Sequence, residues 1–283
     1  MSTSRFFFMT KRVAIQGIEG SFHYIVSQLY FDEPVKICPY LSFGEVVDSL
    51  TSKNTDIAVM ALENSIAGSI IPNYAHIDDQ DLHITGEFFL EIQHNLMALS
   101  GQKISDINEV HSHPMALLQC KEFFRHHPHI KLIEDSDTAE VARRIQNNQI
   151  MGVAAIASKE AARIFNLNIL KQSIQTIKHN ETRFVIVERI LEPKNTNLVN
   201  KASVKFLLDH KRGSLAAMLN VMSDCNLNLT KIQSLPKIDT PWKYAFFVDI
   251  TFKSYADYEK GKAIMEIMAE EFKILGEYKN AKK

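Results

Sequence analysis

A threonine and an arginine stand side by side in the segment Asn180–Phe184, which reads NETRF. Apolar side chains at every second position after it predict that the segment opens a strand. The hydroxyl of Thr182 can donate a hydrogen bond, and the guanidinium of Arg183 can pair with a carboxylate. We interpret the segment as a hydroxyl donor beside a carboxylate partner.

A second polar group follows the apolar run 56–62, which has the length of a buried strand. It consists of Glu63, Asn64 and Ser65, with Ser69 shortly after. Polar side chains at the end of a buried strand are the usual place for function in α/β proteins. A simple helix cap at Asn64 or Ser65 is an equally good interpretation of this segment.

A third group surrounds a predicted helix start at Pro114, a position where the missing N–H of proline costs nothing. Gln119 comes seven residues, about two helical turns, after Ser112. Both side chains could therefore face one ligand. Taken alone, the motif is better explained by Ser112 or His113 capping the helix, with Gln119 exposed.

A glycine-containing turn at 17–22 follows the first strand. Backbone N–H groups near Ser21 could bind an anion there, although such a sequence taken alone is more often just a tight turn. The glycine spacing is not that of a dinucleotide fingerprint, and no cofactor motif is present elsewhere. The histidine-rich stretch 125–129 contains a proline and has no Asp or Cys at useful spacing, so we predict an exposed helix end and no metal.

The elements that must position these groups alternate along the chain. Strands are predicted at 13–15, 56–62 and 151–157, and helices after Ser42, from Pro114 and over 137–145. This alternation predicts α/β layers around a largely parallel, buried sheet. Ligands of such proteins bind near the carboxyl ends of strands, often in a cleft between two lobes.

The pattern changes after a polar, Asn-rich linker at 192–201. Strands are then expected at 202–209, 228–235 and 242–251, helices at 213–224 and 255–272, and a last edge strand at 274–278. The order βαββαβ is that of the ferredoxin-like fold.

Composition excludes several classes of partner. The 283 residues carry a formal net charge of -1 with acids and bases interspersed, so neither a nucleic acid nor a membrane surface is expected as a partner. Three cysteines, Cys38, Cys120 and Cys225, match no disulfide framework or zinc pattern and indicate a reducing cytoplasm. The run Phe6–Met9 is too short for a signal peptide, and we expect Met9 to be the native start, or residues 1–10 to be an extension.

Taken in order, these motifs resemble the prephenate dehydratase family. The resemblance covers the chain from residue 11 onward and rests on EGSF (19–22), ENS (63–65), SHP…QC (112–120), DTA (137–139), AAIAS (154–158) and NETRF (180–184). The last part of the chain resembles an ACT domain through GSL (213–215) and NLNLTKIQS (226–234).

The resemblance implies a catalytic region at 11–191 with two α/β lobes like those of type 2 periplasmic binding proteins, a linker at 192–201 and an ACT domain at 202–279. It implies conversion of prephenate to phenylpyruvate without a cofactor. By family pattern, Thr182 is the central catalytic hydroxyl. The other implied catalytic residues are Glu63, Asn64, Ser112 and Gln119, and the implied substrate-binding residues are Ser21, Ser69, Arg183 and Phe184.

The resemblance also implies feedback inhibition by phenylalanine, bound to the ACT domain at a dimer interface of a homodimer or homotetramer. The implied effector residues are Gly213, Ser214, Leu215, Asn226, Asn228, Leu229 and Thr230. Two departures from the family stand out. Met115 replaces a common glutamine, and the ESRP motif reads QSLP at 233–236, which removes a charge pair from the effector site.

Two other functions remain open at this point. Arogenate carries an ammonium group where prephenate has a keto group, so one polar contact could make the chain an arogenate dehydratase. A non-catalytic amino-acid-binding regulator would also suit two lobes and an ACT domain. The intact set of Asn64, Ser112, Gln119 and Thr182 argues against the regulator, which would have no reason to keep a hydroxyl donor.

Overall fold

A computed structural model describes residues 10–189, 195–209, 211–237, 240 and 243–282. The chain forms two compact units. The first consists of Met1–Gly68 with Leu90–Phe184, and the second of Ser69–Phe89 with Val185–Lys283. The expected start at Met9 and the first part of the expected linker, 192–194, lie outside the described residues.

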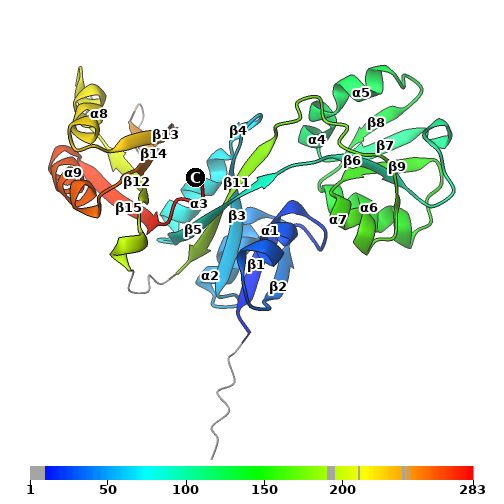
Figure 1. Ribbon diagram of the computed structural model, residues 1–283, viewed down its shortest axis with the longest axis horizontal. Helices are drawn as coiled ribbons and strands as arrows, with labels where there is room; N and C mark the ends of the chain where they lie inside the picture. Colours follow the sequence, from blue (N-terminus) through cyan, green and yellow to red (C-terminus); the bar gives the residue numbers. More distant parts are fainter. Residues whose placement is uncertain (1–9, 190–194, 210, 238–239, 241–242, 283) are drawn as a thin grey trace, which may run out of the picture. The chain divides into compact units, whose positions relative to one another are not determined.

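The first unit contains two sheets, which we call its first and second lobes. The first lobe has the parallel order β3-β1-β2. Arg12 and Val13 lie opposite Lys36 and Ile37 on one side, and Val13 lies opposite Ile57 on the other. Its elements are β1 (Arg12–Gln16), α1 (Phe22–Tyr30), β2 (Lys36–Tyr40), α2 (Phe43–Thr51) and β3 (Ile57–Asn64). The predicted strand at 13–15 is fully buried, which is why its sequence is a continuous apolar run. It belongs to β1, which lies between β3 and β2 (Figure 1).

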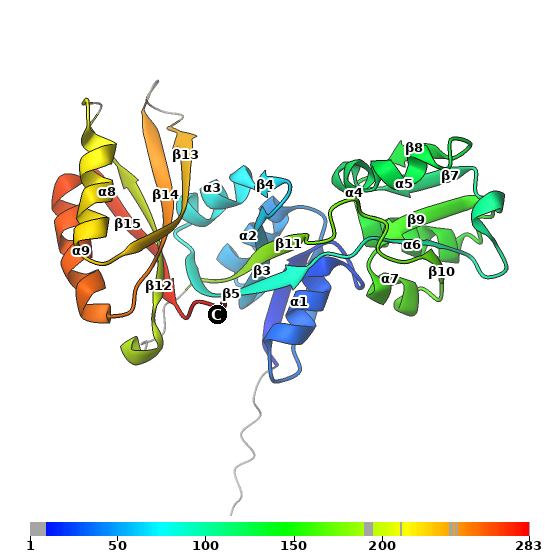
Figure 2. The same cartoon turned by 45° about the horizontal axis from the view of Figure 1, so that its top comes forward.

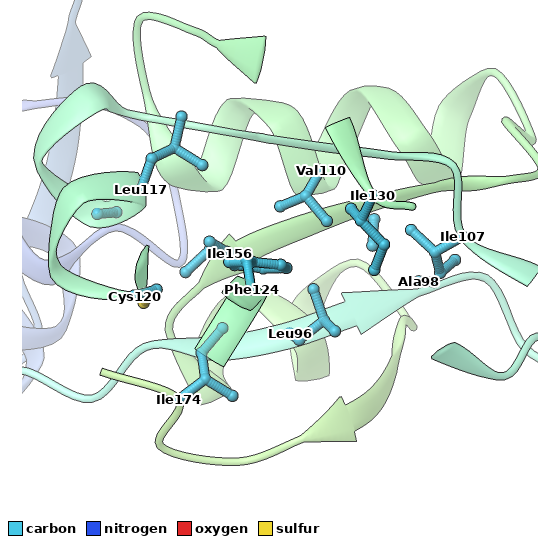
Figure 3. Close-up of a cluster of buried hydrophobic side chains, with 12 residues drawn as sticks. Leu96, Ala98, Ile107, Val110, Leu117, Cys120, Phe124, Ile130, Ile156 and Ile174 are labelled. Carbon is cyan, nitrogen blue, oxygen red and sulfur yellow. The ribbon is translucent and has the colours of Figure 1, made fainter. Parts of the chain in front are cut away.

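The second lobe has the strand order β10-β6-β9-β7-β8. Its strands are β6 (Asn95–Ala98), β7 (Glu109–Ser112), β8 (Lys131–Glu134), β9 (Val153–Ala157) and β10 (Asn168–Lys171). Its helices are η1 (Ile104–Asp106), α4 (Pro114–Gln119), α5 (Lys121–Arg125), α6 (Thr138–Asn147) and α7 (Lys159–Ile164). One of its apolar cores gathers Leu96, Val110, Phe124 and Ile156 from different elements (Figure 3).

The prediction of a largely parallel sheet is only partly right for this lobe. β7 runs parallel to β8 and β9, but β6 runs antiparallel to β9 and β10. The predicted helix from Pro114 is confirmed at its start and is interrupted at Cys120, whose φ of -100° and ψ of 3° leave the helical region. Leu117, Cys120 and Phe124 are nevertheless buried together, as their spacing predicted.

Two crossover segments join the lobes of the first unit, at 92–94 and 174–180. They are tied to each other by backbone hydrogen bonds from Ile92 N to Asn180 O (2.6 Å) and from Ile174 N to His94 O (2.8 Å). The lobes also touch through Ser158, which caps α7 and donates a hydrogen bond to Gly20 O (2.6 Å). We call the two crossover segments the hinge, because they connect the lobes.

The second unit contains the βαββαβ order that the sequence predicted, with the sheet order β13-β14-β12-β15 (Figure 2). Its elements are β12 (Lys201–Leu207), α8 (Ser214–Asp224), β13 (Asn228–Pro236), β14 (Tyr244–Thr251), α9 (Tyr255–Met268) and β15 (Glu271–Tyr278). The 3-10 helix η2 (Thr196–Leu198) precedes them, and α3 (Ile71–Asp79) also belongs to this unit.

Two details of the prediction for this unit are wrong. The helix expected to end at 272 ends at Met268, because Phe272 enters β15 and pairs with Phe206. The last strand is not an edge strand. β15 pairs with β12 on one side, and Gly276 pairs with Ile84 of β5 (His83–Glu91) on the other.

A buried ion pair connects three segments of this unit. The ammonium of Lys201 lies 2.8 and 3.0 Å from the two carboxylate oxygens of Glu87, and their side chains are 6% and 0% exposed. The backbone N–H of Ala281 donates to the same carboxylate (3.1 Å). The pair therefore holds the start of β12, β5 and the C-terminal segment together.

Candidate active site

Thr182 lies on β11 (Glu181–Glu188), with Asn180 two residues earlier. Because side chains two residues apart in an extended segment point to the same side, Asn180 and Thr182 can both reach Asn64 at the end of β3. The amide nitrogen of Asn64 lies 2.9 Å from Thr182 Oγ1 and 2.6 Å from Asn180 Oδ1. The structure thus brings together the predicted residues Asn64 and Thr182.

The backbone fixes which end of the Asn64 amide is which. Its Oδ1 accepts hydrogen bonds from the N–H groups of Ile66 (3.0 Å) and Ala67 (2.8 Å), so Nδ2 must be the atom that faces Thr182. Thr182 Oγ1 is therefore an acceptor toward Asn64. Its own proton has no acceptor within the described part of the chain and can be donated to a ligand.

Gln119, at the end of α4, joins the same network through Asn180. Asn180 Nδ2 donates to Gln119 Oε1 (2.8 Å), and His94 Nε2 lies 2.9 Å from that oxygen. The Gln119 side chain is half-buried, whereas Asn180 and His94 are 0% and 4% exposed. Thr182, Asn64, Asn180, Gln119 and His94 therefore form one continuous chain of polar side chains.

Burial lowers the pKa of His94 to about 4, so the imidazole is neutral at pH 7. Its ring also meets the ring of Phe22 edge-on, with centroids 5.9 Å apart. Phe22 is the first residue of α1, whose N-cap Ser21 accepts a hydrogen bond from Tyr24 N (3.2 Å). The predicted residue Ser21 is thus a helix cap, 3% exposed, in the first lobe.

The structure does not bring the other predicted residues into this chain. Ser112 is fully buried, and its hydroxyl donates to Ile156 O (2.7 Å). Phe184 is 1% exposed and packs edge-on against His23, with centroids 5.0 Å apart, so it is a core residue. Arg183 is 4% exposed and lies on the opposite face of β11 from Thr182, because adjacent strand residues alternate.

Two predicted polar residues remain. Glu63 is half-buried and adjoins Asn64 at the end of β3. Ser69 belongs to the second unit, where its hydroxyl accepts a hydrogen bond from Lys231 Nζ (2.8 Å). Its role in substrate binding stays a prediction.

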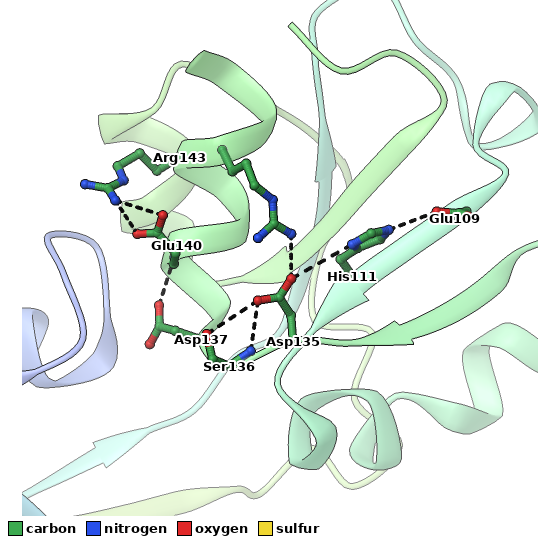
Figure 4. Close-up of polar contacts among 8 residues, drawn as sticks. Glu109, His111, Asp135, Ser136, Asp137, Glu140 and Arg143 are labelled. Carbon is green, nitrogen blue, oxygen red and sulfur yellow. Dashed lines mark hydrogen bonds and ion pairs between the residues drawn. The ribbon is translucent and has the colours of Figure 1, made fainter. Parts of the chain in front are cut away.

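The loop after β8 faces the glycine turn of the first lobe. Asp137 caps α6 by accepting from Glu140 N (2.8 Å), and burial raises the pKa of its carboxyl group. Asp135 lies 2.5 Å from Arg144 and 4.0 Å from His111, contacts that hold the loop in place (Figure 4). A Cβ on Gly17 would stand 3.0 Å from Asp137 Oδ2, so the two segments meet closely.

The residues expected to bind an effector lie in the second unit. Gly213, with φ at +87°, caps the start of α8, and Ser214 and Leu215 line a cavity of about 170 Å³ with Tyr244. Pro236, the last residue of the QSLP segment, pairs with Tyr244 and so lies at this end.

The remaining effector residues lie beyond the other end of α8. Asn226 follows the helix, Asn228 donates to Thr251 Oγ1 (3.4 Å), and Thr230 donates to Asp249 O (3.1 Å). Leu229 packs against the core of the unit. Because α8 is about 16 Å long, one copy of the chain does not join the two groups into one site.

Sequence reasoning missed Asn180 and His94. Asn180 is the first residue of the NETRF segment, and its spacing of two positions from Thr182 was the signal that could have placed both side chains on the same face. No signal pointed to His94, because its neighbours along the chain do not reveal its partner twenty-five residues away.

Across the described residues, no group of three or more His, Cys, Asp or Glu side chains is arranged to hold a metal ion. None of the helices in the described ranges has the length and apolar character needed to cross a membrane.

Comparison with known proteins adds the relatives of the chain. It is 38% identical over 225 residues to arogenate dehydratase 2 of Petunia hybrida, and the aligned region covers 80% of this chain and 57% of that protein. It is 34% identical over 278 residues to arogenate dehydratase/prephenate dehydratase 2, chloroplastic, of Arabidopsis thaliana, with 94% and 72% covered. The chain thus spans less than two thirds of the first of these relatives.

A solved structure of the prephenate dehydratase of Staphylococcus aureus matches with a TM-score of 0.81 and 27% identity, over 94% of this chain and 99% of that one. The family model for prephenate dehydratase matches residues 13–190, more than half of the chain. The chain therefore belongs to the prephenate dehydratase family.

Proposed function

We propose that this protein is a prephenate dehydratase, which converts prephenate to phenylpyruvate with loss of carbon dioxide and water, as a step of phenylalanine biosynthesis in the cytoplasm. The catalytic region is residues 11–191, followed by a linker at 192–201 and a regulatory ACT domain at 202–279. The observation that carries the proposal is the direction of the Asn64–Thr182 hydrogen bond, which leaves the hydroxyl proton of Thr182 available.

The reaction breaks two bonds and makes the ring aromatic. The electron pair of the bond to the ring carboxylate flows into the ring as carbon dioxide leaves, and the ring hydroxyl departs with its own electron pair. Hydroxide is a poor leaving group and takes up a proton to become water. No electron sink beyond the ring itself is needed.

Thr182 fits the site of the leaving hydroxyl. A threonine hydroxyl is a weak acid, so its role is to give an oriented hydrogen bond to the departing oxygen as negative charge develops there. Glu63, the neighbour of Asn64 at the end of β3, is the candidate donor of the proton that the leaving group takes up on the family resemblance alone. A positioned general acid typically contributes about 10²–10⁴ in rate.

The Gln119 amide is the second donor of the site. Its Oε1 is occupied by Asn180 and His94, so its Nε2 is left to bind an oxygen of the substrate. A substrate carboxylate is a suitable partner, because a donor amide binds it without the tight pairing that would stabilise the ground state. On the family resemblance alone, Ser112 remains a candidate catalytic residue, and Arg183 and Ser69 remain candidates for substrate binding.

Arogenate dehydratase is the alternative, since the names of the two plant relatives include arogenate dehydratase. The two substrates differ at one substituent, a keto group or an ammonium group, and undergo the same chemistry. The Asn64–Thr182 contact serves the leaving hydroxyl in either case.

For regulation we propose that phenylalanine binds between ACT domains of two copies in a homodimer or homotetramer. The separation of Gly213–Leu215 from Asn226–Thr230 by α8 supports a site shared between copies. The QSLP segment lies beside the first group, so the lost acid and arginine weaken phenylalanine binding. Isothermal titration with phenylalanine measures that binding, and the absence of heat would rule out the effector.

The experiment that tests the activity compares both substrates in one assay. Purified protein is mixed with prephenate or arogenate, and phenylpyruvate or phenylalanine is followed as the product. We expect turnover of prephenate with a kcat/KM above that for arogenate. A higher value for arogenate would support the alternative, and no turnover of either by folded protein would support a binding protein.

A further inference from the structure

We propose that Asn180 and His94 are positioning residues that orient the Gln119 amide, so that its Nε2 group faces the substrate. This inference rests on the proposed function. It assigns a role to two side chains on the crossovers between the lobes, neither of which touches the substrate.

The direction of the whole chain of hydrogen bonds follows from its backbone end. Asn64 Nδ2 is a donor, so the atom of Asn180 that faces it must be the acceptor Oδ1. The other end of the Asn180 amide is then a donor, and it meets Gln119 at 2.8 Å, where only an oxygen can receive it.

The same logic fixes the tautomer of His94. Its Nε2 lies 2.9 Å from the oxygen of Gln119, and two acceptors cannot face each other at that distance, so Nε2 carries the proton. His94 Nδ1 is buried and has no hydrogen-bond partner among the described residues, so no acceptor there calls for a proton on Nδ1. Each link thus donates or accepts in one direction only.

Hydrogen bonds anchor the backbone of both residues. His94 N donates to Gln175 Oε1 (3.0 Å), and His94 O accepts from Ile174 N (2.8 Å). Asn180 O accepts from Ile92 N (2.6 Å). Asn180, in the hinge, therefore connects Asn64 of the first lobe to Gln119 of the second by one hydrogen bond to each.

Replacing Asn180 by Asp makes a specific prediction. A carboxylate accepts but does not donate, so the Gln119 oxygen could no longer face position 180. The Gln119 amide would flip, so that its oxygen faces the substrate and its nitrogen faces His94. The histidine would have to move its proton from Nε2 to Nδ1 to accept that hydrogen bond.

The first test reads the tautomer directly and needs no activity. Long-range ¹H–¹⁵N spectra of the full-length, ¹⁵N-labelled protein at pH 7 distinguish protonated from bare ring nitrogens, and the signal missing from His94→Gln assigns His94. We expect Nε2–H in the wild type and Nδ1–H in Asn180→Asp. A wild-type signal for Nδ1–H would overturn the proposal.

The second test compares variants of His94. His94→Gln can place an N–H where the imidazole Nε2–H stands, whereas His94→Leu cannot donate. Removing a preorganised donor of an active site typically costs about 10²–10³ in kcat, so we expect a loss of this size for His94→Leu and Asn180→Asp, with most activity kept in His94→Gln. Equal activity of His94→Leu and wild type would contradict the positioning role.

Gln102→Glu controls for the burial of a new charge. Gln102 is 5% exposed in the same unit and accepts from Gly152 N (2.6 Å), away from the polar chain. We expect it to lower stability but not kcat. Should the wild type turn over neither substrate, the proposed function fails while the tautomer result still decides the direction of the hydrogen bonds.

Discussion

Changing Asn64 to Asp isolates the donor that sets the direction of the Thr182 hydroxyl. The carboxylate keeps the shape of the side chain and can still accept from Ile66 N and Ala67 N. It cannot donate to Thr182 Oγ1 or Asn180 Oδ1, so the hydroxyl of Thr182 turns its proton toward position 64 and away from the substrate.

Two effects follow, and they differ in size. Loss of the hydrogen bond to Asn180 Oδ1 at about 1 kcal/mol, with a further cost of about 1–3 kcal/mol for that oxygen left without a donor, lowers the free energy of unfolding by about 2–4 kcal/mol. Loss of an oriented donor at the developing charge lowers kcat by about 10²–10³. Urea unfolding measures the first effect, and the rate of phenylpyruvate formation measures the second.

Asn95→Asp is the control, because the Nδ2 of Asn95 likewise donates to more than one acceptor, Gln93 O and Ala157 O (3.3 Å each), and Asn95 is buried where Asn64 is half-buried. We expect a similar loss of stability in this variant with kcat close to that of the wild type. The reasoning would be refuted if folded Asn64→Asp turned over within about threefold of the wild type, or if both variants lost kcat equally.

Two further predictions concern stability. Lys201→Met removes the ammonium group from the buried pair with Glu87, so we expect the free energy of unfolding in urea to fall by about 3–5 kcal/mol. The control is Lys211→Met at an exposed position, for which we expect a fall of less than about 0.5 kcal/mol. Equal effects of the two variants would contradict the stabilising role of the buried pair. Burial raises the pKa of Asp137, so its ionised form costs stability above its ordinary pKa of 3.8, and protonation removes that cost at lower pH. Asp137→Asn keeps the cap to Glu140, and we therefore expect the stability of this variant relative to the wild type to rise as pH increases from 3.8 through the raised pKa; a difference independent of pH would argue against it.

Local sequence patterns predicted the elements that carry the site. The continuous apolar run at 13–15, the helix start after Ser42 and the proline at 114 each reflect a constraint that acts within one element. Ser42 caps α2 by accepting from Glu45 N (3.2 Å), and the Glu45 carboxylate accepts from Leu41 N (2.8 Å). β2 escaped prediction because it is short, partly exposed and contains Pro39.

The partners of the site residues could not be predicted in this way. Asn64 and Thr182 are separated by 118 positions, and only the family resemblance placed them together before the structure did. Ser112 matches the same resemblance, yet its hydroxyl is used by the backbone of Ile156. Alternation of side chains along the strand placed Phe184 on the same face as Thr182. It could not tell that Phe184 is buried in the core.

The central claim is that Thr182 acts by donating a hydrogen bond to the leaving hydroxyl, and comparing Thr182→Val with Thr182→Ser on prephenate tests it most directly. Valine keeps the shape of the threonine side chain and loses the hydroxyl, whereas serine keeps the hydroxyl and loses the methyl group. Thr182 is 7% exposed in the wild type. We predict that kcat falls by about 10²–10³ in the valine variant and stays within about tenfold of wild type in the serine variant. A folded valine variant with the kcat of the wild type would contradict the account.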